Sequence, residues 1–118
     1  MDTPSAVSTL SALSHEGRLS IFRELVQAGP DGLAAGEVAR RLRIVPNTLS
    51  ASLTILSHAG LVASRRDGRS IIYRADFGRM GDLLAFLVQD CCQGHPEICA
   101  PVTEIAARAA CCEVKGTA

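Results

Sequence analysis

The chain has 118 residues, which is enough for one compact domain with its own core. Apolar residues make up 47% of it and aromatic residues only 3%, and no stretch reaches the roughly 18 uninterrupted apolar residues of a membrane span. The first residues also lack the basic region of a signal peptide, so we expect a cytoplasmic protein without a membrane partner.

Charge is uneven along the chain although it sums to zero. Between residues 40 and 74 there are seven arginines against one acid, a local net charge of +6, so the remainder sums to −6. The arginines are Arg40, Arg41, Arg43, Arg65, Arg66, Arg69 and Arg74. A basic middle between acidic ends indicates one surface that faces phosphate groups, although these arginines could simply be solvated.

The first two predicted helices lie before residue 30. Residues 5–13 have weak helical character. Ser14 can N-cap a second helix, which ends at the Gly-Pro-Asp-Gly segment of residues 29–32. Apolar residues recur at helical spacing in this helix and are expected in the core: Leu19, Phe22, Leu25 and Val26.

The next two segments predict a helix-turn-helix. A third helix is expected over residues 35–42, with Val38 facing inward and the charged side chains facing outward. Pro46 suits the first turn of a fourth helix, which ends at Gly60. That helix carries an apolar stripe of Leu49, Leu53 and Leu56. Two short helices with a tight connection are typical of this motif.

Residues 61–74 predict a β-hairpin. Two β-prone runs flank the pair Asp67-Gly68, a strong signal for a type I′ turn, because that turn needs positive φ at both central residues. Arginines lie on both sides of the tip, and we call Arg65, Arg66 and Arg69 the wing arginines. The hairpin is therefore expected to form a basic wing.

A last helix is predicted from about Gly78 to the helix-ending residues Gly94 and Pro96. Its apolar stripe can pack on the core or on a second subunit, and we expect a homodimer. The stripe comprises Met80, Leu83, Leu84, Leu87, Val88 and Cys91. The fold class is thus mainly α (α+β), a winged helix-turn-helix of about five helices and one β-hairpin. Residues 1–92 would form this DNA-binding and dimerisation domain, and residues 93–118 a cysteine-containing tail.

Three segments share their pattern with one known family. They are residues 12–22 (ALSHEGRLSIF), residues 36–42 (GEVARRL) and residues 47–62 (NTLSASLTILSHAGLV). In that order they resemble the opening helix, the first helix-turn-helix element, and the recognition helix with its exit into the wing of the ArsR/SmtB metalloregulators. The resemblance covers residues 10–92 and implies a DNA-binding transcriptional repressor, not an enzyme. The chain departs from the family pattern at Ala51 and Ser52.

The fourth helix is expected to lie in the major groove of operator DNA, with its N-terminal residues nearest the bases. The groove-facing residues would be those opposite the leucine stripe: Asn47, Thr48, Ser50, Ala51 and Thr54. The wing arginines would contact phosphate or reach into the minor groove, which adds affinity more than sequence choice. The alternative is that these short polar residues are only the solvated face of a core helix.

All five cysteines lie after residue 90, and in a reducing compartment they indicate free thiols or ion ligands before disulfides. Cys91, Cys92 and Cys99 can form a three-sulfur cup where Gly94 and Pro96 end the helix. Three thiolates suit a trigonal pyramidal ion such as As(III) or Sb(III) better than zinc, which prefers four ligands. The sequence therefore predicts a site for a soft ion that acts as inducer, with no organic cofactor.

A vicinal cysteine pair followed by a third cysteine after the last helix resembles the site of arsenite-responsive family members, which implies control of arsenic resistance genes. Other family sites cannot be assembled, because the third helix has no cysteine and the last helix no histidine. His95 could complete a four-coordinate site for zinc or cadmium, although a solvated loop histidine is the favoured interpretation. The second pair, Cys111 and Cys112, is expected to supply accessory thiols.

The expected mechanism is derepression. Ion binding at the end of the last helix would favour a dimer geometry that no longer spans both half-sites of a pseudo-palindromic operator. The main alternative is a thiol redox or persulfide sensor, in which Cys91 or Cys92 forms a disulfide with Cys99 or the distal pair. A thiol enzyme or sulfur carrier, with His95 as its base, and an interaction module without a DNA role are two further alternatives.

Overall fold

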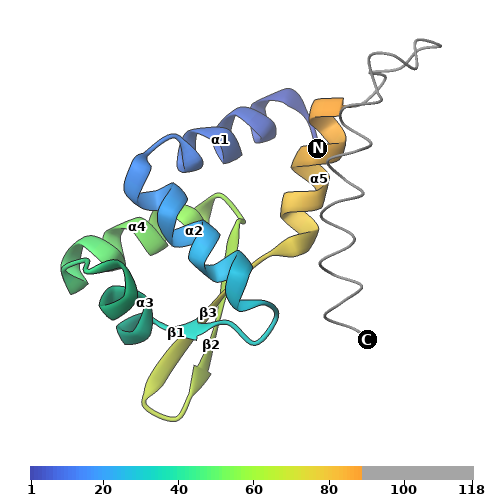
Figure 1. Cartoon of the computed structure of the whole chain (residues 1–118). Coiled ribbons are helices and arrows are strands. Elements are labelled where there is room, and N and C mark those ends of the chain that lie inside the picture. The colour runs from blue at the N-terminus through green and yellow to red at the C-terminus, as the bar shows by residue number, and fades with distance from the viewer. Residues whose placement is uncertain (89–118) are drawn as a thin grey trace. The chain divides into compact units, whose positions relative to one another are not determined.

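The computed structural model describes residues 1–88. These residues form five helices and a three-stranded antiparallel sheet (Figure 1), which confirms the predicted winged-helix class. In chain order the elements are α1 (Thr3–Leu13), α2 (Glu16–Ala28), β1 (Leu33–Ala34), α3 (Ala35–Leu42), α4 (Pro46–His58), β2 (Val62–Asp67), β3 (Ser70–Ala75) and α5 (Phe77–Val88). No helix in this range is long and apolar enough to cross a membrane.

The cap of α2 differs from the prediction. Ser14 is not the N-cap, because it ends α1, and the cap position falls on His15. His15 Nδ1 accepts hydrogen bonds from the backbone N–H groups of Gly17 at 3.1 Å and Arg18 at 3.3 Å. An imidazole nitrogen that carries no proton can accept a hydrogen bond, as a serine oxygen does. Histidine can therefore serve as the N-cap here, although it is not among the residues preferred at this position.

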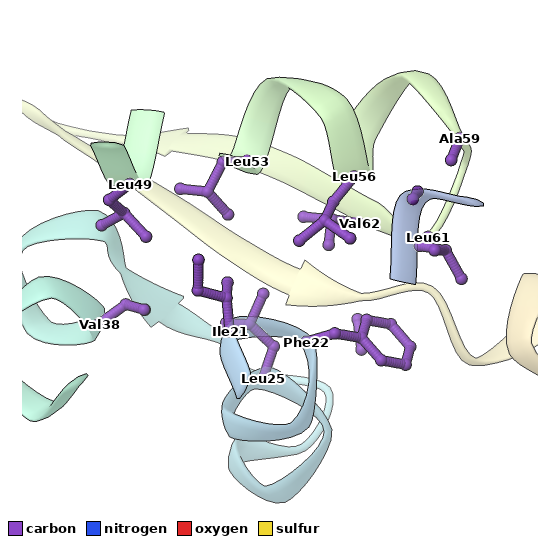
Figure 2. Packing of buried hydrophobic residues seen from close by; sticks show 12 residues of the cluster. Ile21, Phe22, Leu25, Val38, Leu49, Leu53, Leu56, Ala59, Leu61 and Val62 are labelled. Atoms are coloured by element: carbon purple, nitrogen blue, oxygen red, sulfur yellow. The ribbon is translucent and has the colours of Figure 1, made fainter. Parts of the chain in front are cut away.

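The hydrophobic core lies where α2, α3 and α4 meet (Figure 2), and the leucine stripe of α4 points into it as predicted. Its buried members are Ala12, Ile21, Phe22, Leu25, Val38, Leu49, Leu53, Leu56, Ala59, Leu61, Val62 and Ala75. Leu19, which was expected here, is 43% exposed. The buried face of α2 is centred on Ile21 and Leu25, and Leu19 lies well to one side of it at 3.6 residues per turn.

Helices α3 and α4 form the predicted helix-turn-helix, joined by the short segment from Arg43 to Val45. Arg43 ends α3 in the left-handed conformation, with φ 55° and ψ 47°. The next residue, Ile44, donates its N–H to the carbonyl oxygen of Ala39 at 3.0 Å and packs against the core. This arrangement closes the end of α3 and fixes the direction in which α4 leaves it.

The sheet contains one strand that the sequence did not reveal. Its order is β1-β3-β2, and β1 adds the pairs Leu33↔Tyr73 and Ala34↔Ile72 to the predicted hairpin. Gly32, just before β1, has φ 73°, and a Cβ built there would come within 2.3 Å of the Tyr73 carbonyl oxygen. Only glycine therefore allows this loop to lie so close to the base of the wing.

The wing turn lies one residue later than predicted. Asp67 pairs with Ser70 across the hairpin, so the two loop residues are Gly68 and Arg69 rather than Asp67 and Gly68. Gly68 has φ 63°, whereas Arg69 is not among the residues with positive φ. This is the φ pattern of a type II′ turn, which needs glycine only at its first central position, so the predicted type I′ turn is wrong.

Helix α5 begins directly after the sheet. Asp76 Oδ1 accepts a hydrogen bond from the backbone N–H of Arg79 at 2.9 Å and so caps the first turn. The Arg79 side chain then reaches α1, where its Nη2 donates to the buried Thr9 hydroxyl at 3.3 Å. On the same helix Leu83 is buried, whereas Leu84 is 55% exposed. Within the described residues the predicted apolar stripe of α5 is thus partly buried and partly exposed.

Candidate nucleic-acid interface

Helix α4 has two chemically different faces. Its inner face buries the three leucines of the stripe together with Ser52, one of the two positions that depart from the family pattern. The five residues predicted to face the groove are all exposed: Asn47, Thr48, Ser50, Ala51 and Thr54. The Thr54 hydroxyl donates a hydrogen bond to the carbonyl oxygen of Ser50 at 2.9 Å. The outer face of α4, as we call these five residues, is polar, has only short side chains and is free of the core.

The N-terminus of α4 carries no side-chain cap. Val45 occupies the cap position, Pro46 has no N–H to donate, and the first turn contains no acidic residue. The partial positive charge of the helix end is therefore not compensated by its own first turn, which suits approach to a negatively charged polymer. This is the end of α4 that was predicted to lie nearest the bases.

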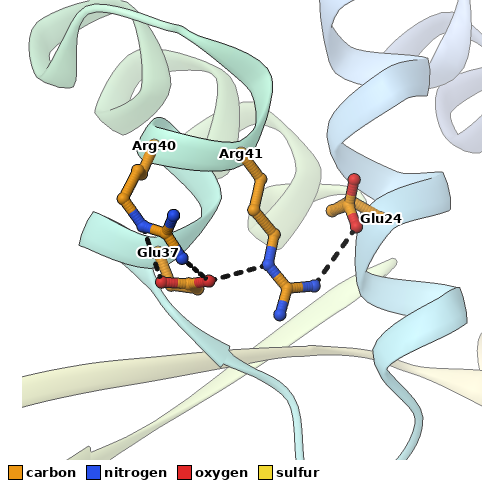
Figure 3. Close-up of polar contacts among 4 residues, drawn as sticks. All are labelled: Glu24, Glu37, Arg40 and Arg41. Atoms are coloured by element: carbon orange, nitrogen blue, oxygen red, sulfur yellow. Dashed lines mark hydrogen bonds and ion pairs between the residues drawn. The ribbon is translucent and has the colours of Figure 1, made fainter.

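Two of the arginines counted in the basic segment are held by acids (Figure 3). Glu37 lies between Arg40 and Arg41, accepting from Arg40 Nε at 3.1 Å on one oxygen and from Arg41 Nε at 2.8 Å on the other. Arg41 Nη1 also reaches Glu24 of α2 at 3.4 Å. We call these four residues the α3 ion-pair network. Its two acids and two bases sum to zero charge.

The electrostatics of the network follow from its hydrogen bonds. Those from Arg40 and then Arg41 lower the pKa of Glu37 to about 2, and the same contacts raise the pKa of both arginines. Sequence reasoning placed these side chains outward but missed Glu37 as a partner, because the charge count began at residue 40. The spacing of three and four residues from Glu37 to the arginines is the signal that indicates such pairs on a helix.

The wing arginines are all exposed, but they do not form one patch. Successive strand residues point to opposite faces, so Arg65 and Arg66 on β2 lie on opposite sides of the wing, and Arg69 lies in the turn. Arg65 Nη2 donates to the carbonyl oxygen of Asp31 at 3.1 Å, which directs it toward the loop before β1. The wing therefore presents cations on both faces and at its tip. Their contact with DNA stays a prediction.

The predicted ion site lies outside the described residues. This holds for Cys91, Cys92 and Cys99, for the accessory pair Cys111 and Cys112, and for His95. Within residues 1–88 no group of three His, Cys, Asp or Glu side chains is placed to hold a metal ion.

Two relatives from Bacillus subtilis share the helix-turn-helix. The helix-turn-helix domain family matches residues 13–65. YceK of Bacillus subtilis is 44% identical over 59 residues, a match that covers 50% of this chain and 58%, less than two thirds, of that protein. YbzH of the same species is 30% identical, with 69% of this chain and 93% of that protein covered. Both are named HTH-type transcriptional regulators, which agrees with the expectation that the chain is not an enzyme.

Solved structures of regulators have the same fold. An ArsR-like transcriptional regulator from Rhodococcus sp. RHA1 is 29% identical, with a TM-score of 0.65 over 87% of this chain and 93% of that one. The homodimeric winged helix-turn-helix DNA-binding domain of Mb0332 from Mycobacterium bovis, a possible ArsR-family regulator, is 27% identical, with a TM-score of 0.59 over 78% and 85%. Together with the helix-turn-helix and wing described above, these likenesses show that the chain belongs to the ArsR family of winged helix-turn-helix, DNA-binding transcriptional regulators.

Proposed function

We propose that the protein is a homodimeric repressor that leaves its operator when a trivalent arsenic or antimony ion binds Cys91, Cys92 and Cys99. The proposal rests mainly on the spacing of these cysteines. Three thiols fall within nine residues, and the first follows α5 closely in the sequence. Because thiolates are soft ligands and His95, the imidazole of this segment, is expected to be solvated, the set favours a three-coordinate soft ion. The regulated genes would then include arsenic resistance functions.

Operator binding is supported by the two faces of α4. The outer face is exposed, has no core role and is made of residues that can hydrogen-bond base edges or contact a thymine methyl group. In a dimer, two such helices about 34 Å apart would enter successive major grooves on one side of the duplex. The wing arginines would add phosphate contacts beside them.

Dimerisation is supported by apolar side chains that are exposed within residues 1–88. On α5 Leu84 is 55% exposed, and on α1 Val7 is also 55% exposed. Two-fold pairs are the commonest assemblies of soluble proteins, and apolar helix faces are what such interfaces cover. The similar DNA-binding domain of Mb0332 is a homodimer. We assign residues 1–92 to DNA binding and dimerisation, and residues 93–118 to the thiol-bearing tail.

Release from DNA follows from linkage between the two sites. An ion that lowers DNA affinity by a given factor must itself bind more weakly by the same factor when operator DNA is present. The three thiolates would hold the ion at the C-terminal side of α5, and a change in the angle between the subunits would move the two α4 helices off their common spacing. Cys111 and Cys112 would capture the ion without being required for release.

The test is fluorescence anisotropy of a labelled DNA fragment from upstream of the protein's own gene, in strong reductant, with arsenite titrated in. Wild type should bind the fragment and release it as arsenite is added. Cys99→Ser should bind equally well and stay bound, because two thiolates leave the ion one ligand short. The matched control is the double variant Cys111→Ser/Cys112→Ser, which should release DNA like wild type.

Other outcomes point to the alternatives. Release by an oxidant without arsenite, reversed by reductant, would replace the ion sensor by a thiol redox or persulfide sensor. If arsenite releases DNA from the Cys99→Ser variant at the concentration that acts on wild type, Cys99 is not a ligand of the ion. Absence of DNA binding by wild type would contradict the proposed repressor itself.

A further inference from the structure

Arg43 has a backbone conformation that arginine rarely adopts. Within residues 1–88 it is the only residue other than glycine with positive φ, at 55°. It ends α3, where glycine is the common residue because it lacks the Cβ that the left-handed conformation disfavours. The conformation is imposed by its surroundings, since the hydrogen bond from Ile44 to Ala39 at 3.0 Å and the packing of Ile44 both require it.

The charge of Arg43 is also free, in contrast to its two neighbours on α3. Arg40 and Arg41 are bound by Glu37, and Arg41 also by Glu24. Arg43 is exposed and makes no ion pair or side-chain hydrogen bond with any residue of the described range. An unfavourable backbone that holds a solvated cation is stable only because the fold imposes it, and such positions concentrate at functional sites.

We propose that Arg43 binds a phosphate of the operator backbone at the turn of the helix-turn-helix, whereas Arg40 and Arg41 contribute no such contact. The inference rests on the proposed operator binding and adds a residue to it. Arg43 lies three positions before Pro46, at the end of α4 expected to be closest to DNA. A side chain that leaves this turn borders the edge of the major groove, where the phosphates lie. Guanidinium groups bind phosphate with two parallel hydrogen bonds.

The decisive variant is Arg43→Gly, because the proposal predicts that its stability and its DNA affinity change in opposite directions. Glycine relieves the left-handed backbone, so the melting temperature should rise. Loss of the guanidinium should weaken binding of the promoter fragment about fivefold or more. The slope of log affinity against log salt should fall by about 0.9 for each protomer bound. A purely structural arginine would change neither the slope nor the affinity.

Two further variants complete the experiment. Arg43→Lys keeps a cation in the same backbone and should retain most of the salt slope. Arg40→Ala, the matched control, removes an arginine three residues away that is already paired, so its loss of affinity and of slope should be much smaller than that of Arg43→Gly. Arg43→Gly with wild-type slope and affinity, or Arg40→Ala with an equal loss, would overturn the assignment. Failure of wild type to bind DNA would instead contradict the proposed function, so the two failures are distinguishable.

Discussion

Helix α3 and the wing each carry two adjacent arginines, Arg40-Arg41 and Arg65-Arg66, but their surroundings differ. On α3 both arginines are bound by acids, whereas on β2 neither forms an ion pair within residues 1–88. The two pairs are therefore equal in sequence and unequal in the charge that they can offer to DNA. What decides this difference is the presence of Glu37 one helical turn before the first pair.

Replacing all three wing arginines by alanine should produce the largest effect and breaks the wing side of the comparison. We expect DNA affinity to fall at least about a hundredfold at physiological salt, and the salt slope to fall by about 2.7 per protomer if all three contact phosphate. Salt-dependent anisotropy measures both quantities. A slope loss nearer 1.8 would mean that one of the three arginines faces away from DNA. Arg65 is the first candidate, because its side chain is hydrogen-bonded to the carbonyl oxygen of Asp31.

Glu37→Gln should make α3 behave more like the wing. Without the carboxylate Arg40 loses its partner, Arg41 keeps only Glu24, and the network gains one positive charge. DNA affinity should rise by about twofold to fivefold with a steeper salt slope, since binding is driven by cations near phosphate. The same anisotropy titration measures this change. An affinity equal to wild type would show that α3 lies too far from the duplex for its charge to matter.

Gly68→Ala tests the wing through its shape and leaves every arginine in place. Gly68 has φ 63°, and a Cβ there meets no atom within 4 Å, so the cost is conformational only. We expect the free energy of unfolding to fall by about 1 kcal/mol, or the hairpin alone to become less ordered at a similar cost. DNA binding should become a few-fold weaker. Urea unfolding and anisotropy separate the two contributions. Unchanged DNA binding would show that the turn geometry is dispensable for the wing contacts.

The smallest expected effect is the pH dependence of the α3 ion-pair network. The pKa of Glu37 is lowered from 4.5 in its ordinary state to about 2 in the folded chain. Since the unfolded state binds this proton first, the contribution of the network is complete above about pH 5 and is lost as the pH falls toward 2. The difference in urea midpoint between wild type and Glu37→Gln should therefore shrink over this range. A difference that stays constant down to pH 2 would rule out the carboxylate as its source.

The parts of the fold that sequence predicted are those with a strong local pattern. The leucine stripe of α4 and the limits of α3 follow from helical periodicity with a proline at the next helix start. Strand β1 escaped because two residues, Leu33 and Ala34, cannot show alternation, and its existence depends on a pairing with β3 that is distant in sequence. The turn of the wing was misplaced by one residue because Asp-Gly and Gly-Arg both satisfy turn preferences, and cross-strand register decides between them.

The candidate site was predictable to a similar degree. The outer face of α4 follows from its leucine stripe, because the two faces are complementary on one helix. The pairing of Arg41 with Glu24 was not predictable, since it joins helices whose separation is set by the core. The cap at His15 was also missed, because histidine is an uncommon cap and Ser14 stood beside it. The cysteine site lies outside the described residues and stays a prediction.

The short side chains on the outer face of α4 have a consequence for how operator preference can diverge. Ala51 is exposed and is not among the residues that form the core or pack against it, so a longer polar residue at this position adds a new hydrogen-bonding group without altering the core. Asn or Gln at such a position would favour adenine, whereas Arg would favour guanine. Duplicate copies of a gene with this scaffold would thus acquire separate operators by single substitutions at Ala51, while the rest of the chain stays the same.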